Sequence, residues 1–154
     1  MLRRRKAIKV DENTLDNIRI LQQLKDNVRE VKKCYSKMSR DKMATCVKEI
    51  CKTSDLIIKE VSLNQNKIHM VNLFTKHYLP TVIKMLRQYI NISDNKLAGK
   101  NCEEIKQVVE EMLPKVQQAF QELLDQLFNT ENNDIEIDIQ VMMQEFSRRG
   151  LLDD

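Results

Sequence analysis

Histidines, cysteines and carboxylates are the residues of this chain whose types could support catalysis or metal binding. The two histidines, His69 and His77, lie eight residues apart, whereas a two-histidine metal site on a helix needs them about one turn apart. No Glu-x-x-His motif, glycine-rich phosphate loop or nucleophile elbow accompanies them. We therefore predict no catalytic, cofactor-binding or metal-binding residue, and we favour surface or capping roles for both histidines.

The four cysteines form no CxxC pair, and their spacing matches no zinc pattern. We expect free thiols that pack as small hydrophobic residues: Cys34, Cys46, Cys51 and Cys102. Cys46 and Cys51 lie in a basic part of the chain, which would lower a thiol pKa, but nothing brings a histidine to them. The chain is predicted to be cytoplasmic, because it shows no export signal and no apolar stretch of about 18 residues. A peripheral position at the inner membrane surface stays open.

Charge is distributed unevenly along the chain, although the net charge is only +3. Residues 1–77 hold 18 Lys and Arg against 9 Asp and Glu, whereas residues 78–154 hold 8 against 14. We favour attraction between helices as the cause, and a disordered basic tail over residues 1–10. The tail carries the candidate residues for binding an anion such as a nucleic-acid phosphate or an acidic lipid headgroup: Arg3, Arg4, Arg5 and Lys6.

Composition and apolar spacing predict an all-α protein. With 2 Gly and 2 Pro, the chain has too few turn residues for a β-sandwich, a β-barrel or a Rossmann unit. Apolar residues recur at alternating steps of three and four over residues 21–38 and 43–61, which is typical of helices joined by a short polar turn. We predict an elongated antiparallel bundle of about four to six helices. It forms a single domain over residues 11–150, with a short tail at 151–154.

Prolines and caps mark the expected ends and bends of these helices. Ser62–Gln65 fits a capping box with Ser62 as the cap. Pro80 is expected to push Leu79 out of the helical conformation, so that the helix bends or restarts there. Pro114 should kink the most apolar helix.

The second half of the chain carries one clear loop signal, over residues 92–100, followed by a cap signature at Asn101. Apolar residues of the last segment alternate as in a strand but also align at helical spacing from Ile135 to Phe146. Because no partner strand is evident, we predict a helix that ends at Gly150.

Two segments of the sequence resemble a known bacterial family. They are Phe74–Tyr89 (FTKHYLPTVIKMLRQY) and Ala119–Phe128 (AFQELLDQLF), and the second is followed by Asp-Ile at 134–135 and Asp-Ile-Gln-Val at 138–141. Their order and spacing also resemble those of the XpaC-like family, which is named for 5-bromo-4-chloroindolyl phosphate hydrolysis. The resemblance covers about half of the chain and implies no set of catalytic residues.

The resemblance implies a protein partner, since genes of this family frequently lie beside those of the toxic-anion-resistance (TelA-like) family. Family members often have a membrane-embedded N-terminal part, and this chain resembles a cytosolic form without it. Four candidate interaction residues lie in the matched segments: Tyr78, Pro80, Asp134 and Asp138. The two aspartates could form a docking surface, but we favour a role in capping helices and pairing with Arg148 or Arg149.

Three functions follow from these observations. We favour a non-catalytic interaction or scaffold protein linked to envelope or toxic-anion stress, with a TelA-like partner and with self-association left open. The alternative is the phosphate-ester hydrolase that the family name suggests, which needs a metal ion or convergent cations and a nucleophile. A second alternative is a protein that binds anionic membrane or nucleic acid through the basic N-terminus.

Overall fold

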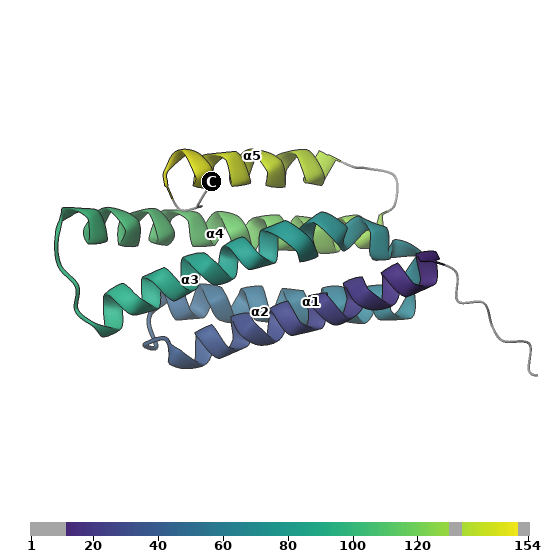
Figure 1. The fold of residues 1–154 in the computed structure, drawn as a ribbon, viewed down its shortest axis with the longest axis horizontal. Coiled ribbons are helices and arrows are strands. Elements are labelled where there is room, and N and C mark those ends of the chain that lie inside the picture. Colours follow the sequence, from purple (N-terminus) through teal and green to yellow (C-terminus); the bar gives the residue numbers. More distant parts are fainter. Residues whose placement is uncertain (1–11, 130–133, 151–154) are drawn as a thin grey trace, which may run out of the picture.

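The computed structural model describes residues 12–129 and 134–150, and the side chains of residues 134–138 are not among those described. Within these ranges the chain forms helices and no strand, which confirms the predicted all-α class (Figure 1). Both predicted tails, 1–10 and 151–154, lie outside the described residues. The elements are α1 (Glu12–Lys37), α2 (Lys42–Leu63), the 3-10 helix η1 (Gln65–Val71), the π-helix η2 (Phe74–Tyr78), α3 (Leu79–Asp94), α4 (Lys100–Phe128) and α5 (Asp134–Arg148).

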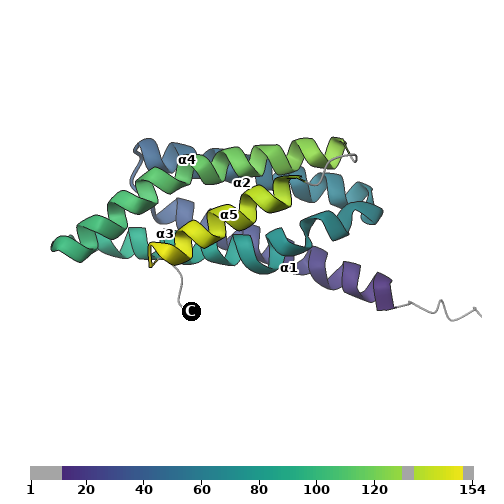
Figure 2. The same ribbon diagram turned by 90° about the horizontal axis from the view of Figure 1, so that it is seen from above.

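Helices α1 to α4 form an elongated bundle in which α1 contacts α2 and α3, and α4 contacts α2 and α3. The fifth helix, α5, lies on the outside of this bundle: Figure 1 shows it beside α4, and Figure 2 shows it crossing obliquely between α3 and α4. The architecture is therefore a four-helix bundle with one additional helix on its surface.

The predicted apolar spacing of α1 and α2 corresponds to their buried faces. Leu24 and Val31 of α1 and Val47, Ile50 and Ile57 of α2 have no exposed surface. These side chains recur at steps of three and seven, so each helix turns one continuous stripe towards the core. Burial of these stripes is the main source of stability for helices whose remaining faces are charged.

The turn between α1 and α2 ends in a helix cap. Asp41 Oδ1 accepts hydrogen bonds from the backbone N–H groups of Met43 (3.0 Å) and Ala44 (3.1 Å). These groups have no acceptor within the helix, because the first turn lacks a preceding one. Asp41 thus fixes the residue at which α2 begins.

Replacing Asp41 with alanine is expected to lower the free energy of unfolding by about 1 kcal/mol, because two N–H groups lose their acceptor. Chemical denaturation followed by circular dichroism measures this loss. Asp41→Asn is the matched control and should retain most of the stability, since an amide oxygen also accepts at this position. Equal stability of the alanine variant and the wild type would show that the cap does not contribute.

The predicted capping box at Ser62 is wrong. Ser62 lies inside α2, which ends at Leu63, and the residue between α2 and η1 is Asn64. The Asn64 side chain makes no cap and donates instead to Glu60 Oε1 at 2.9 Å. The break between two helices is present, but it is produced by a change to a 3-10 helix rather than by a serine cap.

Pro80 does not displace Leu79 from the helical conformation, contrary to the prediction. Leu79 has φ −61° and ψ −46°, and its N–H donates to the carbonyl of Phe74, five residues earlier. Pro80 lies in the first turn of α3, where its missing N–H costs least. The π-helix precedes the proline directly, so the chain changes from one helical geometry to another there and stays helical.

Pro114 lies in the middle of α4, which continues on both sides of it, and α4 is visibly bent in Figure 2. The predicted loop at 92–100 is shorter, because α3 extends to Asp94. The predicted cap at Asn101 is wrong: α4 begins at Lys100, after Gly99, whose φ of 139° favours glycine. As predicted, Gly150 follows the last helix, with φ 77°.

Candidate helix-docking site

The groove between α3 and α4 holds α5 along one apolar face. The face consists of residues spaced at three, four and seven: Ile139, Met142, Met143 and Phe146. This spacing places them on one side of a helix. Ile139 is 4% exposed and Phe146 is 2% exposed, so both are as buried as the bundle core.

The floor of the groove comes from two helices and from the π-helix that precedes them. It is lined by Tyr78, Val82, Val116, Ala119 and Phe120. The space left between this floor and α5 is about 10 Å³, which is at the lower limit for one water molecule. The contact between α5 and the bundle is therefore close-packed and apolar.

The four candidate interaction residues lie in or near the contact between α5 and the groove. Tyr78 is buried beneath α5 and forms part of its seat, whereas Pro80 is half-buried in the first turn of α3. Asp134 and Asp138 belong to α5, but their side chains lie outside the described residues. The ring of Tyr78 therefore packs beneath the last helix of its own chain.

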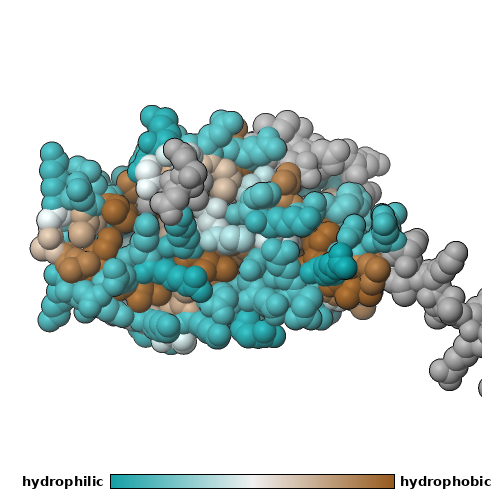
Figure 3. Space-filling view, viewed as in Figure 1, coloured by the Kyte–Doolittle hydropathy of each residue, from teal (hydrophilic) through white to brown (hydrophobic). Residues whose placement is uncertain are grey.

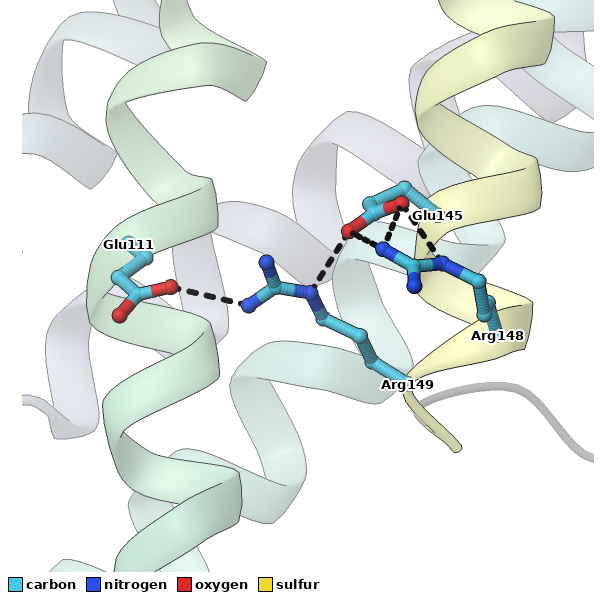
Figure 4. Close-up of polar contacts among 4 residues, drawn as sticks. All are labelled: Glu111, Glu145, Arg148 and Arg149. Carbon is cyan, nitrogen blue, oxygen red and sulfur yellow. Dashed lines mark hydrogen bonds and ion pairs between the residues drawn. The ribbon is translucent and has the colours of Figure 1, made fainter.

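An ion pair of Arg149 links the end of α5 to α4 (Figure 4). Arg149 donates from Nη1 to Glu111 Oε2 on α4 at 2.9 Å and from Nε to Glu145 Oε1 at 2.8 Å. Arg148 donates to the same Glu145, at 2.6 and 2.8 Å. In Figure 4 the Arg149 guanidinium lies between the two carboxylates, so it links α5 to α4 while Arg148 stays within its own helix.

The ion pairs shift the pKa values of Glu145 and Arg149 towards their charged forms. Hydrogen bonds from Arg148 and Arg149 hold the pKa of Glu145 below its ordinary value. Hydrogen bonds from Glu145 and Glu111 raise the pKa of Arg149. Because the folded-state pKa of Glu145 is lowered, its pairing with Arg148 and Arg149 contributes stability at neutral pH, and this contribution is lost as pH falls through the folded pKa of Glu145.

Arg149→Met is expected to speed hydrogen exchange of the α5 amides at neutral pH, because it removes the link to Glu111 and keeps the alkyl stem. Arg148→Met is the matched control, since Arg148 makes no described contact with α4. Identical protection of the α5 amides from exchange in the two variants would contradict a role of the Arg149–Glu111 ion pair in holding α5 against α4.

The histidines do not converge with acids or with Arg87. His69 and His77 are both exposed, and His69 Nδ1 lies 2.8 Å from the carbonyl of Asn66. Arg87 lies ten residues beyond His77 and pairs with Glu30 of α1 at 2.9 Å. In the part of the chain that the structure describes, no three His, Cys, Asp or Glu side chains are grouped so as to hold a metal ion.

The cysteines are free, and three are buried, as the sequence predicted. Burial raises the pKa of Cys46 and of Cys51 to about 11, so the basic surroundings do not lower it. Burial also raises the pKa of Cys34. Cys46 Sγ donates to Gln117 Oε1 of α4 at 3.1 Å, which assigns this thiol a packing role between α2 and α4.

Direct pairing between the two halves of the chain does not account for their unequal charge. Ion pairs between different elements join Lys32 to Asp55, Lys67 to Glu60, Arg87 to Glu30 and Arg149 to Glu111. Among the described residues, none of these joins a base of residues 1–77 to an acid of residues 78–154. The favoured interpretation, attraction between helices of the two halves, is therefore not supported by the contacts.

The fold defines a class of protein: an all-helical bundle whose own last helix, α5, packs in an apolar groove on its surface. A sequence model of the family described as 5-bromo-4-chloroindolyl phosphate hydrolysis protein matches residues 3–142, and the chain belongs to this XpaC-like family. The match also covers residues 3–70, which precede the two segments that carried the resemblance. We found no curated protein and no solved structure that matches the chain. None of the described helices is long and apolar enough to cross a membrane.

Proposed function

We propose that this protein is a non-catalytic interaction protein whose α3–α4 groove binds an amphipathic helix. The observation that carries the proposal is the seat of α5, an apolar face that fits the groove with almost no space left. Amphipathic helices bind grooves through anchors at i, i+3, i+4 and i+7, and α5 has anchors at these positions. The groove therefore has the shape and polarity of a helix receptor, with α5 as its internal ligand.

The composition of the contact favours exchange of α5 for another helix. Met142 and Met143 are flexible side chains that adapt to different packing partners. The described polar link to the bundle at this end is the Arg149–Glu111 ion pair, which is solvent-exposed. A partner helix with a similar apolar row can thus compete with α5 for the groove.

The partner that we propose is a TelA-like protein, and the process is the response to envelope or toxic-anion stress. This proposal rests on the family to which the chain belongs and on the groove. Calorimetric titration of a purified TelA-like protein into the full chain tests it. Phe146→Asp, which loosens α5, should strengthen binding at least about tenfold, whereas Val141→Asp on the exposed side of α5 should leave it unchanged. Equal affinities for both variants would contradict the groove as the binding site.

The family name makes phosphate-ester hydrolysis the second candidate function. It is tested by incubating the purified chain with 5-bromo-4-chloroindolyl phosphate and with Mg²⁺, Mn²⁺ or Zn²⁺ in turn. We expect the rate of the buffer alone. Turnover by the wild type that a single substitution such as His77→Ala abolishes would overturn the non-catalytic proposal.

A further inference from the structure

A second groove, open to solvent, follows the first turns of α4 beyond the end of α5. Its floor contains Ile105 and Val108, and its volume is about 590 Å³. Its rim is polar, with Asn101, Glu104, Gln107 and Glu111 on α4 and Arg149 at one end. Figure 1 shows that α4 extends past α5 here, and Figure 3 shows hydrophobic surface at this end of the molecule.

The groove continues the face of α4 on which α5 is seated. Glu111 and Arg149 line it and also form the ion pair that ends the α5 contact. The apolar face of α4 is thus covered by α5 over one part of its length and open over the next. A segment that lies in the open part extends an interface that already exists.

The charge of the rim selects a basic segment. None of the ion pairs among the described residues includes Glu104, and Glu111 shares its single described cation, Arg149, with Glu145. The rim thus has one unpaired carboxylate beside an apolar floor. A complementary segment presents aliphatic side chains to Ile105 and Val108 and a Lys or Arg to Glu104.

We propose that the segment that occupies this groove is residues 1–10 of a second copy of the chain. Its sequence, MLRRRKAIKV, combines five basic residues with aliphatic ones: Leu2, Ala7, Ile8 and Val10. One segment thus supplies both the charge and the apolar side chains that the groove lacks.

The position of α1 favours a second copy over the same chain. Helix α1 begins at the end of the bundle opposite to the first turn of α4 (Figure 1). Helix α1 has 26 residues and is about 39 Å long, and eleven residues span about 38 Å only when fully extended. Head-to-tail copies bring the segment to the groove without this extension. Such a contact is heterologous and does not close on itself, so it builds chains of copies.

Sedimentation velocity of the full chain tests this proposal. The weight-average mass is expected to rise with protein concentration at low ionic strength and to fall towards the monomer in about 0.5 M salt, where exposed charges are screened. Glu104→Arg and Arg4→Glu should each weaken association at least about tenfold, and a mixture of the two variants should recover a complex, because the unchanged segment of the Glu104→Arg chain can bind the unchanged groove of the Arg4→Glu chain. Glu103→Arg, on the same turn of α4 but outside the groove lining, is the matched control and should associate like the wild type.

Other occupants of the groove, or other partners of the segment, give different results. A chain that stays monomeric at every concentration, with or without residues 1–10, overturns the proposal. A monomer in which residues 1–10 crosslink to Glu104 of the same copy overturns the second-copy arrangement. Salt-sensitive binding to phosphatidylglycerol vesicles or duplex DNA, with no self-association, assigns the basic residues to an anionic partner and overturns it as well.

Discussion

Replacing Phe120 with alanine is expected to lower the free energy of unfolding by about 3–5 kcal/mol, the largest effect of any substitution that we predict. Phe120 is 2% exposed, and its ring meets that of Phe74 edge to face, with 4.6 Å between the centroids. The contact joins the π-helix to α4, and Phe120 also lies in the floor beneath α5. Chemical denaturation followed by circular dichroism measures the loss.

Phe128→Ala is the matched control on the same helix. Phe128 is 66% exposed, and its ring has Lys67 Nζ 5.9 Å from its centroid. Phe128→Ala should therefore lower the free energy of unfolding by about 1 kcal/mol or less. Similar losses for the two phenylalanines would contradict the burial of the face of α4 that carries Phe120.

The second large effect is expected from Lys67→Met, which should lower the free energy of unfolding by about 2–3 kcal/mol. Lys67 Nζ lies 3.0 Å from Glu60 Oε1, and the two side chains are only 17% and 12% exposed. Lys67 also donates to the carbonyl of Leu127 in the last turn of α4. Methionine keeps the apolar stem but leaves a mostly buried carboxylate without its cation and a helix end without its donor.

A double-mutant cycle separates the ion pair from the other roles of Lys67. Glu60→Gln removes the carboxylate, so the additional cost of Lys67→Met should be smaller in that background than in the wild type. The exposed pair of Lys52 and Glu49 is the comparison, and Lys52→Met should cost less than about 0.5 kcal/mol. Additive losses at Lys67 and Glu60 would show that the two groups do not interact.

Local spacing was sufficient to predict the helices whose burial follows a regular stripe. The steps of three and four in α1 and α2 identified their cores, and Gly150 identified the end of α5. Leu79 was predicted wrongly because the preference of a residue before proline is local, whereas the π-helix depends on an acceptor five residues earlier. The buried Phe74 and Tyr78 hold that irregular turn against the rest of the bundle.

The candidate site could be predicted only in part for a related reason. Helical spacing identified the apolar face of α5, and the family-like segment drew attention to Tyr78 without indicating that α5 covers it. The Arg149–Glu111 pair joins residues 38 positions apart, and no local pattern marks it. Lys67 and Glu60 lie on either side of the break after α2, so their pairing depends on how η1 turns.

The most direct test of the account is whether the α3–α4 groove binds a free α5 peptide. A fluorescent peptide of residues 134–150 is titrated into the full chain, and its anisotropy is followed for the wild type, Phe146→Asp and Val141→Asp. An aspartate at position 146 cannot stay buried without a partner, so α5 leaves the groove and the peptide takes its place.

We predict that the peptide binds the Phe146→Asp chain at least about tenfold more tightly than the wild type, whose own α5 competes, and that Val141→Asp behaves as the wild type. Ile139→Asp provides a second opened chain, and circular dichroism shows that the bundle remains helical. Absence of peptide binding to both opened chains, with the bundle still folded, would contradict the groove as a helix-binding site.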